Sequence, residues 1–127
     1  MKLRIKGNSL RLRLLQSELA KFLDTGRIEE TIQFTPADDA NLTYSLGHDR
    51  STSSIAVRYA DRAIAVALPT ADAESWAKSK QVGIYASVDL GSKGRLEVGV
   101  EKDFACLDLG DGENVDTFPH PSAGTTC

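Results

Sequence analysis

Residues 2–14 read KLRIKGNSLRLRL, and this stretch has the clearest pattern in the chain. Apolar residues alternate with polar ones on both sides of Gly7-Asn8, a pair that is typical of a two-residue turn. The stretch therefore predicts a β-hairpin with one apolar and one polar face. The polar face would carry Ser9 and five cations, which are Lys2, Arg4, Lys6, Arg11 and Arg13.

Beyond this hairpin, segments with helical spacing of apolar residues alternate with segments of period-two spacing. Residues 15–25 have apolar side chains at helical spacing and stop at Gly26, which predicts a helix. A second helix is expected over residues 70–78, with Thr70 as its N-cap. Period-two alternation predicts strands over residues 27–34, 42–46, 55–59, 63–68, 82–88 and 96–100. Residues 47–54 are polar and are interpreted as an exposed loop, and the sequence shows no internal repeat.

These elements predict an α+β fold, mostly an antiparallel sheet of about seven strands with two short helices. The pattern is compatible with a sheet that curls toward a barrel, with the helix over residues 15–25 plugging one opening. A length of 127 residues suits one domain. We expect a β-rich domain over residues 1–108, followed by an acidic, Gly- and Pro-containing tail over residues 109–127 with little order and with Phe118 as its candidate anchor.

Composition excludes several classes of protein. Hydrophobic residues make up 41% and charged residues 26%, which excludes a wholly disordered chain. The longest apolar run is far shorter than the ~20 residues that span a bilayer, so no membrane association is expected. Without a signal-peptide pattern and with Cys106 and Cys127 as the two cysteines, a reduced cytoplasmic protein is expected. His48 and His120 show no metal-ligand spacing, so neither a metal nor a cofactor is predicted.

Charge is distributed unevenly along the chain. The net charge is −3 and the isoelectric point is near 5.3, which is not typical of a general nucleic-acid binder. Residues 1–15 nevertheless hold five cations and no acid. In the predicted hairpin Arg4 faces Arg11 and Lys2 faces Arg13, and such like-charge pairs each destabilise a sheet by up to about 1 kcal/mol. A sequence that keeps them is expected to offer this face to something negative.

Three partners for the basic face remain open, besides solvent alone. The first is internal, from Glu97 and Glu101 or from acids of the tail, which are Asp108, Asp111, Glu113 and Asp116. The second is a small anion such as a phosphate ester, held by arginine forks. The third is nucleic acid, which is disfavoured because no aromatic residue precedes Phe22 and base stacking needs aromatic side chains.

Glu30 interrupts the apolar face of its strand. It is interpreted as a rim residue or as the partner of an arginine in an ion pair, and the alternative is a buried carboxylate that could act as a general acid or base. An enzyme of phosphate-ester or polyphosphate chemistry within a β tunnel is the alternative function. Such enzymes resemble this chain in their alternating basic residues, but they need an acidic strand motif near the start, which residues 1–15 lack.

The favoured interpretation is therefore a small, non-enzymatic binding or interaction domain without an assigned catalytic residue. Its anion-binding candidates are the five cations of the hairpin, and its candidate acidic partners are Glu30, Glu97 and Glu101. The sequence leaves the oligomeric state open.

Several stretches resemble a family of short uncharacterised bacterial proteins. They are the opening KLRIKGNSLRLRL, GRIEETI at residues 26–32, EKDFACL at residues 101–107 and FPHP at residues 118–121. The family has no established activity, so the resemblance implies a bacterial cytoplasmic protein and assigns no site residues. The resemblance also implies Ser or Thr where this chain has Leu15, in a capping box with Glu18, so the start of the first helix is left open.

Overall fold

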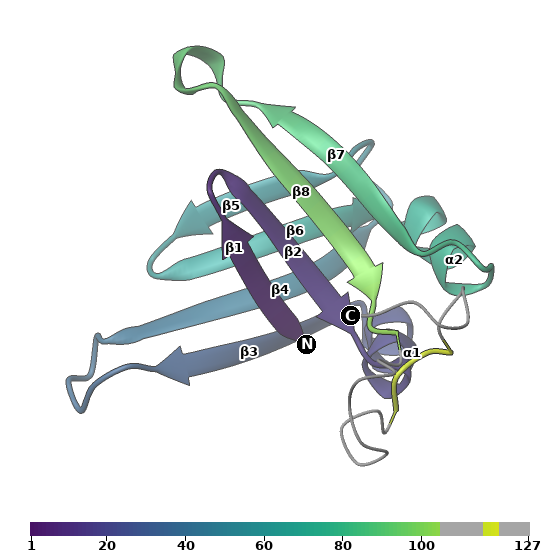
Figure 1. The fold of residues 1–127 in the computed structure, drawn as a ribbon, viewed down its shortest axis with the longest axis horizontal. Helices are drawn as coiled ribbons and strands as arrows, with labels where there is room; N and C mark the ends of the chain where they lie inside the picture. The colour runs from purple at the N-terminus through teal and green to yellow at the C-terminus, as the bar shows by residue number, and fades with distance from the viewer. Residues whose placement is uncertain (105–115, 120–127) are drawn as a thin grey trace.

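The computed structural model describes residues 1–104 and 116–119. These residues form eight strands and two α-helices (Figure 1). In chain order the elements are β1 (Lys2–Lys6), β2 (Ser9–Leu14), α1 (Gln16–Thr25), β3 (Arg27–Gln33), β4 (Asn41–Asp49), β5 (Ala56–Ala60), β6 (Ala63–Pro69), α2 (Thr70–Ala77), β7 (Gly83–Asp89), the 3-10 helix η1 (Gly91–Lys93) and β8 (Arg95–Lys102). The α+β class is confirmed, and the eight strands correspond to the two of the predicted hairpin and the six further predicted ranges, one more than the total of about seven.

The strands form two sheets of four, in the orders β1-β2-β8-β7 and β3-β4-β6-β5. We call them the first and the second sheet. Every sequential hairpin is antiparallel, but the two central pairs, β2 with β8 and β4 with β6, are parallel. Each sheet keeps two strands with a free edge among the described residues, so the expected curling toward a barrel does not reach closure.

The two halves of the chain repeat one topology. Strands β1 and β2, helix α1, and strands β3 and β4 correspond in order to β5, β6, α2, β7 and β8. The register repeats as well, because Ser9 lies opposite Glu97 in the first sheet and Ala63 lies opposite Thr43 in the second. The expectation of no internal repeat is therefore wrong at the level of topology. The halves share an apolar pattern but few identical side chains, which is why comparison of residues misses the repeat.

The core lies between the two sheets and is closed at one end by the helices (Figure 1). Leu12 of β2, Leu46 of β4, Leu68 of β6 and Val100 of β8 have no exposed surface. Helix α1 adds Phe22 and helix α2 adds Trp76, both fully buried. Because each strand alternates, the opposite face of each sheet carries mostly polar or small side chains, with Tyr85 of β7 as a large exception. Among the described residues no helix is long and apolar enough to cross a membrane.

Strand β4 is longer than the sequence predicts. Its last three residues pair with β6, so the interpretation of residues 47–49 as part of an exposed loop is wrong. His48 lies half-buried, with Nδ1 3.0 Å from Thr70 Oγ1 and its ring edge-on to Phe22 at 5.0 Å between centroids. The pairing with the buried strand β6 overrides the local turn preference of this polar stretch.

The N-terminus of α1 is capped by a distant segment. The helix begins after Leu15, whose backbone N–H donates to Glu18 Oε1 at 2.8 Å. Asp116 supplies the rest of the cap, because its carbonyl oxygen accepts from Gln16 N–H at 3.0 Å and its Oδ1 accepts from Ser17 N–H at 3.2 Å. An acid near the C-terminal end of the chain thus takes the place of the Ser or Thr that the family resemblance implies at position 15.

Residues 116–119 also contact the end of β8. Phe118 donates its backbone N–H to the Asp103 carbonyl at 2.8 Å, and its ring lies 6.0 Å from that of Phe104. Lys102 Nζ lies 5.6 Å from the centroid of the Phe118 ring. The other residues after Phe104 that the sequence singled out lie outside the described residues; they are Cys106, Asp108, Asp111, Glu113, His120 and Cys127.

Candidate functional site

The candidate site lies on the outer face of the first sheet, the face turned away from the core. The hairpin predicted from Gly7-Asn8 is confirmed, with Lys2 opposite Arg13, Arg4 opposite Arg11 and Lys6 opposite Ser9. Parallel pairing then places β8 beside β2, and β7 follows. The face is thus a grid of three rows across β1, β2, β8 and β7: Lys6, Ser9, Glu97 and Ser87; Arg4, Arg11, Gly99 and Tyr85; Lys2, Arg13, Glu101 and Gly83.

Internal acids pair with the cations at one end of β1 and β2. Glu101 Oε1 lies 3.5 Å from Arg13 Nε and 3.9 Å from Arg11 Nη1. Asp103 Oδ2 lies 3.0 Å from Lys2 Nζ. Both carboxylates are about nine-tenths buried, but the Lys2 side chain is 69% exposed and the Arg13 side chain 38%, so solvent screens the Lys2 pair more strongly than the Arg13 pair. An internal partner, one of the alternatives that the sequence leaves open, is therefore present at the Lys2 and Arg13 end, where Asp103 joins the candidate Glu101.

The other end, next to the hairpin turn, is less fully covered, because Glu97 in the row of Lys6 and Ser9 lies beside Ser87 instead. Among the described residues no carboxylate forms an ion pair with Arg4 or Lys6. Together with Ser9 and Arg11 they line a hollow of about 130 Å³, and none of these four residues is acidic. Facing cations repel, so this end of the sheet carries an electrostatic cost that a bound anion would relieve.

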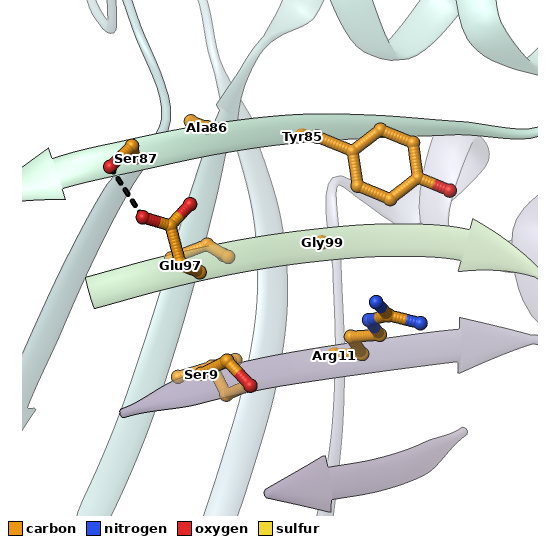
Figure 2. Close-up of a pocket in the computed structure, with 9 residues that line it drawn as sticks. Ser9, Arg11, Tyr85, Ala86, Ser87, Glu97 and Gly99 are labelled. Atoms are coloured by element: carbon orange, nitrogen blue, oxygen red, sulfur yellow. Dashed lines mark hydrogen bonds between the residues drawn. The ribbon is translucent and has the colours of Figure 1, made fainter. Parts of the chain in front are cut away.

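A wider groove of about 590 Å³ adjoins the hollow and shares Ser9 and Arg11 with it. Figure 2 shows Ser9 and Arg11 on one side of this groove and Tyr85 and Ser87 on the other, with Gly99 between them. The groove depends on that glycine, because a β-carbon at position 99 would lie 3.1 Å from Tyr85 Cδ1 and 3.4 Å from Arg11 Cγ. The aromatic ring occupies the space that the missing side chain leaves.

Hydrogen bonds hold the side chains of Tyr85 and Glu97 in the groove. The Tyr85 hydroxyl donates to Glu101 Oε2 at 2.6 Å, and the Ser87 hydroxyl lies 2.6 Å from Glu97 Oε1. Burial, followed by the hydrogen bond and the negative charge of Glu101, raises the pKa of Tyr85 to about 12. The phenol therefore stays protonated at neutral pH and remains a donor, while 56% of the residue's surface is exposed.

The three candidate acids do not lie in one place. Glu97 and Glu101 share the face with the cations, whereas Glu30 belongs to the second sheet. Glu30 Oε2 accepts a hydrogen bond from the Tyr44 hydroxyl at 3.0 Å and lies 3.3 Å from the amino group of Met1. Its side chain is 44% exposed, which agrees with the rim position and not with a buried carboxylate, and its ion-pair partner is the amino group of Met1 instead of the expected arginine.

Sequence reasoning missed Tyr85, Ser87 and Gly99 as members of the face. The alternation of residues 82–88 places Tyr85 and Ser87 on one side of their strand, and this was the available signal. It does not tell which strands lie beside them. In the part of the chain that the structure describes, no group of three metal-ligating side chains comes together.

Comparisons with known proteins place the chain without assigning it an activity. A search of the curated proteins and a search of the solved structures each gave no match. A family described as of unknown function matches nearly the whole chain, which agrees with the resemblance to uncharacterised proteins. The chain belongs to this family, DUF7009, which covers residues 1–122.

Proposed function

We propose that the chain is a small, non-enzymatic binding domain that holds a small anion on the outer face of its first sheet. Arg4, Lys6 and Arg11 supply positive charge and donors at the hollow, and Ser9 adds a hydroxyl. The observation that carries the proposal is this hollow, where three cations gather without an acid in the lining. Arginine guanidinium groups bind phosphate and carboxylate in a bidentate manner, so these are the expected ligand groups.

The internal acids support the same proposal because they pair with the cations at one end of the hairpin and leave those at the other end. Glu101 lies 3.5 Å from Arg13 and 3.9 Å from Arg11, and Asp103 pairs with Lys2. Arg4 and Lys6, at the turn end, are therefore the two cations of the face without an ion-pair partner among the described residues. The hollow lies on an open sheet face that is reached from solvent, which suits reversible binding more than chemistry that must exclude water.

The enzymatic alternative has less support. A carboxylate that acts as acid or base needs to lie free beside the bound group. Glu101 is held by Tyr85 and Arg13, Glu97 lies within hydrogen-bond distance of Ser87, and Glu30 lies on the other sheet. A nucleic-acid surface would need several stacking side chains, and Tyr85 is the single aromatic residue in the three rows of the face.

A titration of the ¹⁵N-labelled protein with inorganic phosphate, followed by NMR, tests the proposal. Sodium chloride at matched ionic strength serves as the reference. We expect saturable shifts at Arg4, Lys6, Ser9 and Arg11, with a dissociation constant on the order of millimolar for so open a site. The double variant Arg4→Glu/Arg11→Glu should lose them.

Arg58→Glu is the matched control for Arg4, because Arg58 holds on β5 the position that Arg4 holds on β1. It should bind phosphate as the wild type does. Shifts that do not exceed those with sodium chloride, or that persist unchanged in the double variant, would refute the anion site.

A further inference from the structure

The groove beside the hollow has features that a simple anion does not use. It has about 590 Å³ of space, which is within the range of sites for small organic ligands. It is continuous with the hollow through Ser9 and Arg11. We propose that the anion is the phosphate of a nucleoside monophosphate whose base stacks on Tyr85, an inference that rests on the proposed function.

The spacing of the strands sets the length of the ligand. The hollow lies over β1 and β2, and the Tyr85 ring lies over Gly99 of β8. Neighbouring strands are about 4.8 Å apart, so the two subsites are separated by about 7 Å, one and a half strand spacings. A ribose between phosphate and base bridges such a distance. A simple sugar phosphate has no group beyond its sugar ring, so with its phosphate in the hollow it would not reach Tyr85.

Tyr85 has the properties of a stacking platform. Its ring lies against the backbone at Gly99 on one side, and 56% of the residue's surface is open to solvent. The hydroxyl is tied to Glu101 at 2.6 Å, which fixes the ring and reduces the entropy lost when a base stacks on it. Any planar base gains stacking energy on such a ring, whatever donors and acceptors the base carries at its edge. The ring by itself therefore does not select among bases.

The middle of the groove suits hydroxyl groups. Glu97 follows Ser9 in the same row of the face, and its Oε1 lies within hydrogen-bond distance of Ser87. Its other oxygen, Oε2, forms no hydrogen bond with a described residue. The hydroxyls of a ribose can donate hydrogen bonds to this oxygen. A carboxylate accepts such bonds more strongly than a neutral acceptor does.

The same acids disfavour a phosphate on the 3′ side of the ribose. The backbone of a nucleic acid continues from that position and would have to pass over β8 beside Glu97 and Glu101. The negative charges of these two side chains would repel that phosphate. We therefore assign the site to a free mononucleotide and not to a single strand of RNA or DNA.

Isothermal titration or NMR titration with three ligands on the wild-type protein tests this inference. The ligands are inorganic phosphate, ribose 5-phosphate and adenosine 5′-monophosphate. We expect the nucleotide to bind at least about fivefold more tightly than ribose 5-phosphate, because the base adds a stacking contact. Tyr85→Ala should abolish this advantage and keep the affinity for phosphate. Tyr85→Phe keeps the ring but loses the hydrogen bond to Glu101, so it should retain most of the advantage. Tyr59→Ala is the control, since Tyr59 is an exposed tyrosine of the second sheet.

The outcomes separate the two proposals. Equal affinity for phosphate, ribose 5-phosphate and the nucleotide overturns the mononucleotide and leaves the anion site intact. No binding of phosphate or of either ester overturns both. Tighter binding of a short oligoadenylate than of the mononucleotide also overturns this inference, in favour of a nucleic-acid ligand.

Discussion

Replacing Arg4 by glutamate should stabilise the fold while it destroys the anion site. Arg4 and Arg11 face each other in the β1–β2 hairpin, and no described acid pairs with Arg4. The change removes one like-charge cross-strand pair and creates one opposite-charge pair, each worth roughly 0.2–1 kcal/mol. Because the Arg11 side chain is 48% exposed, we take the lower part of this range, about 0.5–1 kcal/mol in total. For a chain of this size that raises the unfolding temperature by about 2–4 °C.

Thermal unfolding followed by circular dichroism, in a buffer free of phosphate, measures the effect. Arg58→Glu makes the same change of charge at the equivalent position, where the residue opposite is Ala65. It should therefore leave the unfolding temperature nearly unchanged. In 1 M salt, where the Debye length is about 3 Å, the gain of Arg4→Glu should shrink. An unchanged or lower unfolding temperature for Arg4→Glu at low salt would contradict the electrostatic reasoning.

Two further predictions concern the cap of α1 and the phenol of the groove. Asp116→Ala removes the carboxylate that accepts from Ser17 N–H and keeps the backbone carbonyl that accepts from Gln16 N–H. It should cost about 1 kcal/mol, measured as a lower urea midpoint, and an unchanged midpoint would show that the carboxylate adds no stability. The pKa of Tyr85 is raised from 10.0 to about 12 in the folded protein, so its contribution to stability is complete below pH 10 and is lost as the pH rises through 12. Wild type should thus lose stability relative to Tyr85→Phe between pH 10 and pH 12 in parallel denaturation series, and curves that keep a constant offset would refute this.

Local chemistry along the chain decides much of the fold. The Gly7-Asn8 turn and the alternation around it determine the register of the first hairpin, including the facing pair Arg4 and Arg11. Gly26 ends α1 with a φ of 85°, as its place after the apolar stripe predicts. These features depend on residues that are close together in the chain, so the amino-acid sequence is enough to infer them. The same holds for the basic face, because the face of each residue follows from period two.

What the neighbouring residues do not decide is which strands lie side by side. Alternation tells which side of β8 carries Glu101 and Gly99, but the burial of two sheets against each other places that strand parallel to β2, far away in the chain. That pairing brings Glu101 to Arg13 and Tyr85 to the hollow. The cap from Asp116 and the repeated topology arise in the same way. Such contacts are selected by the packing of the whole core, which no short stretch of sequence encodes.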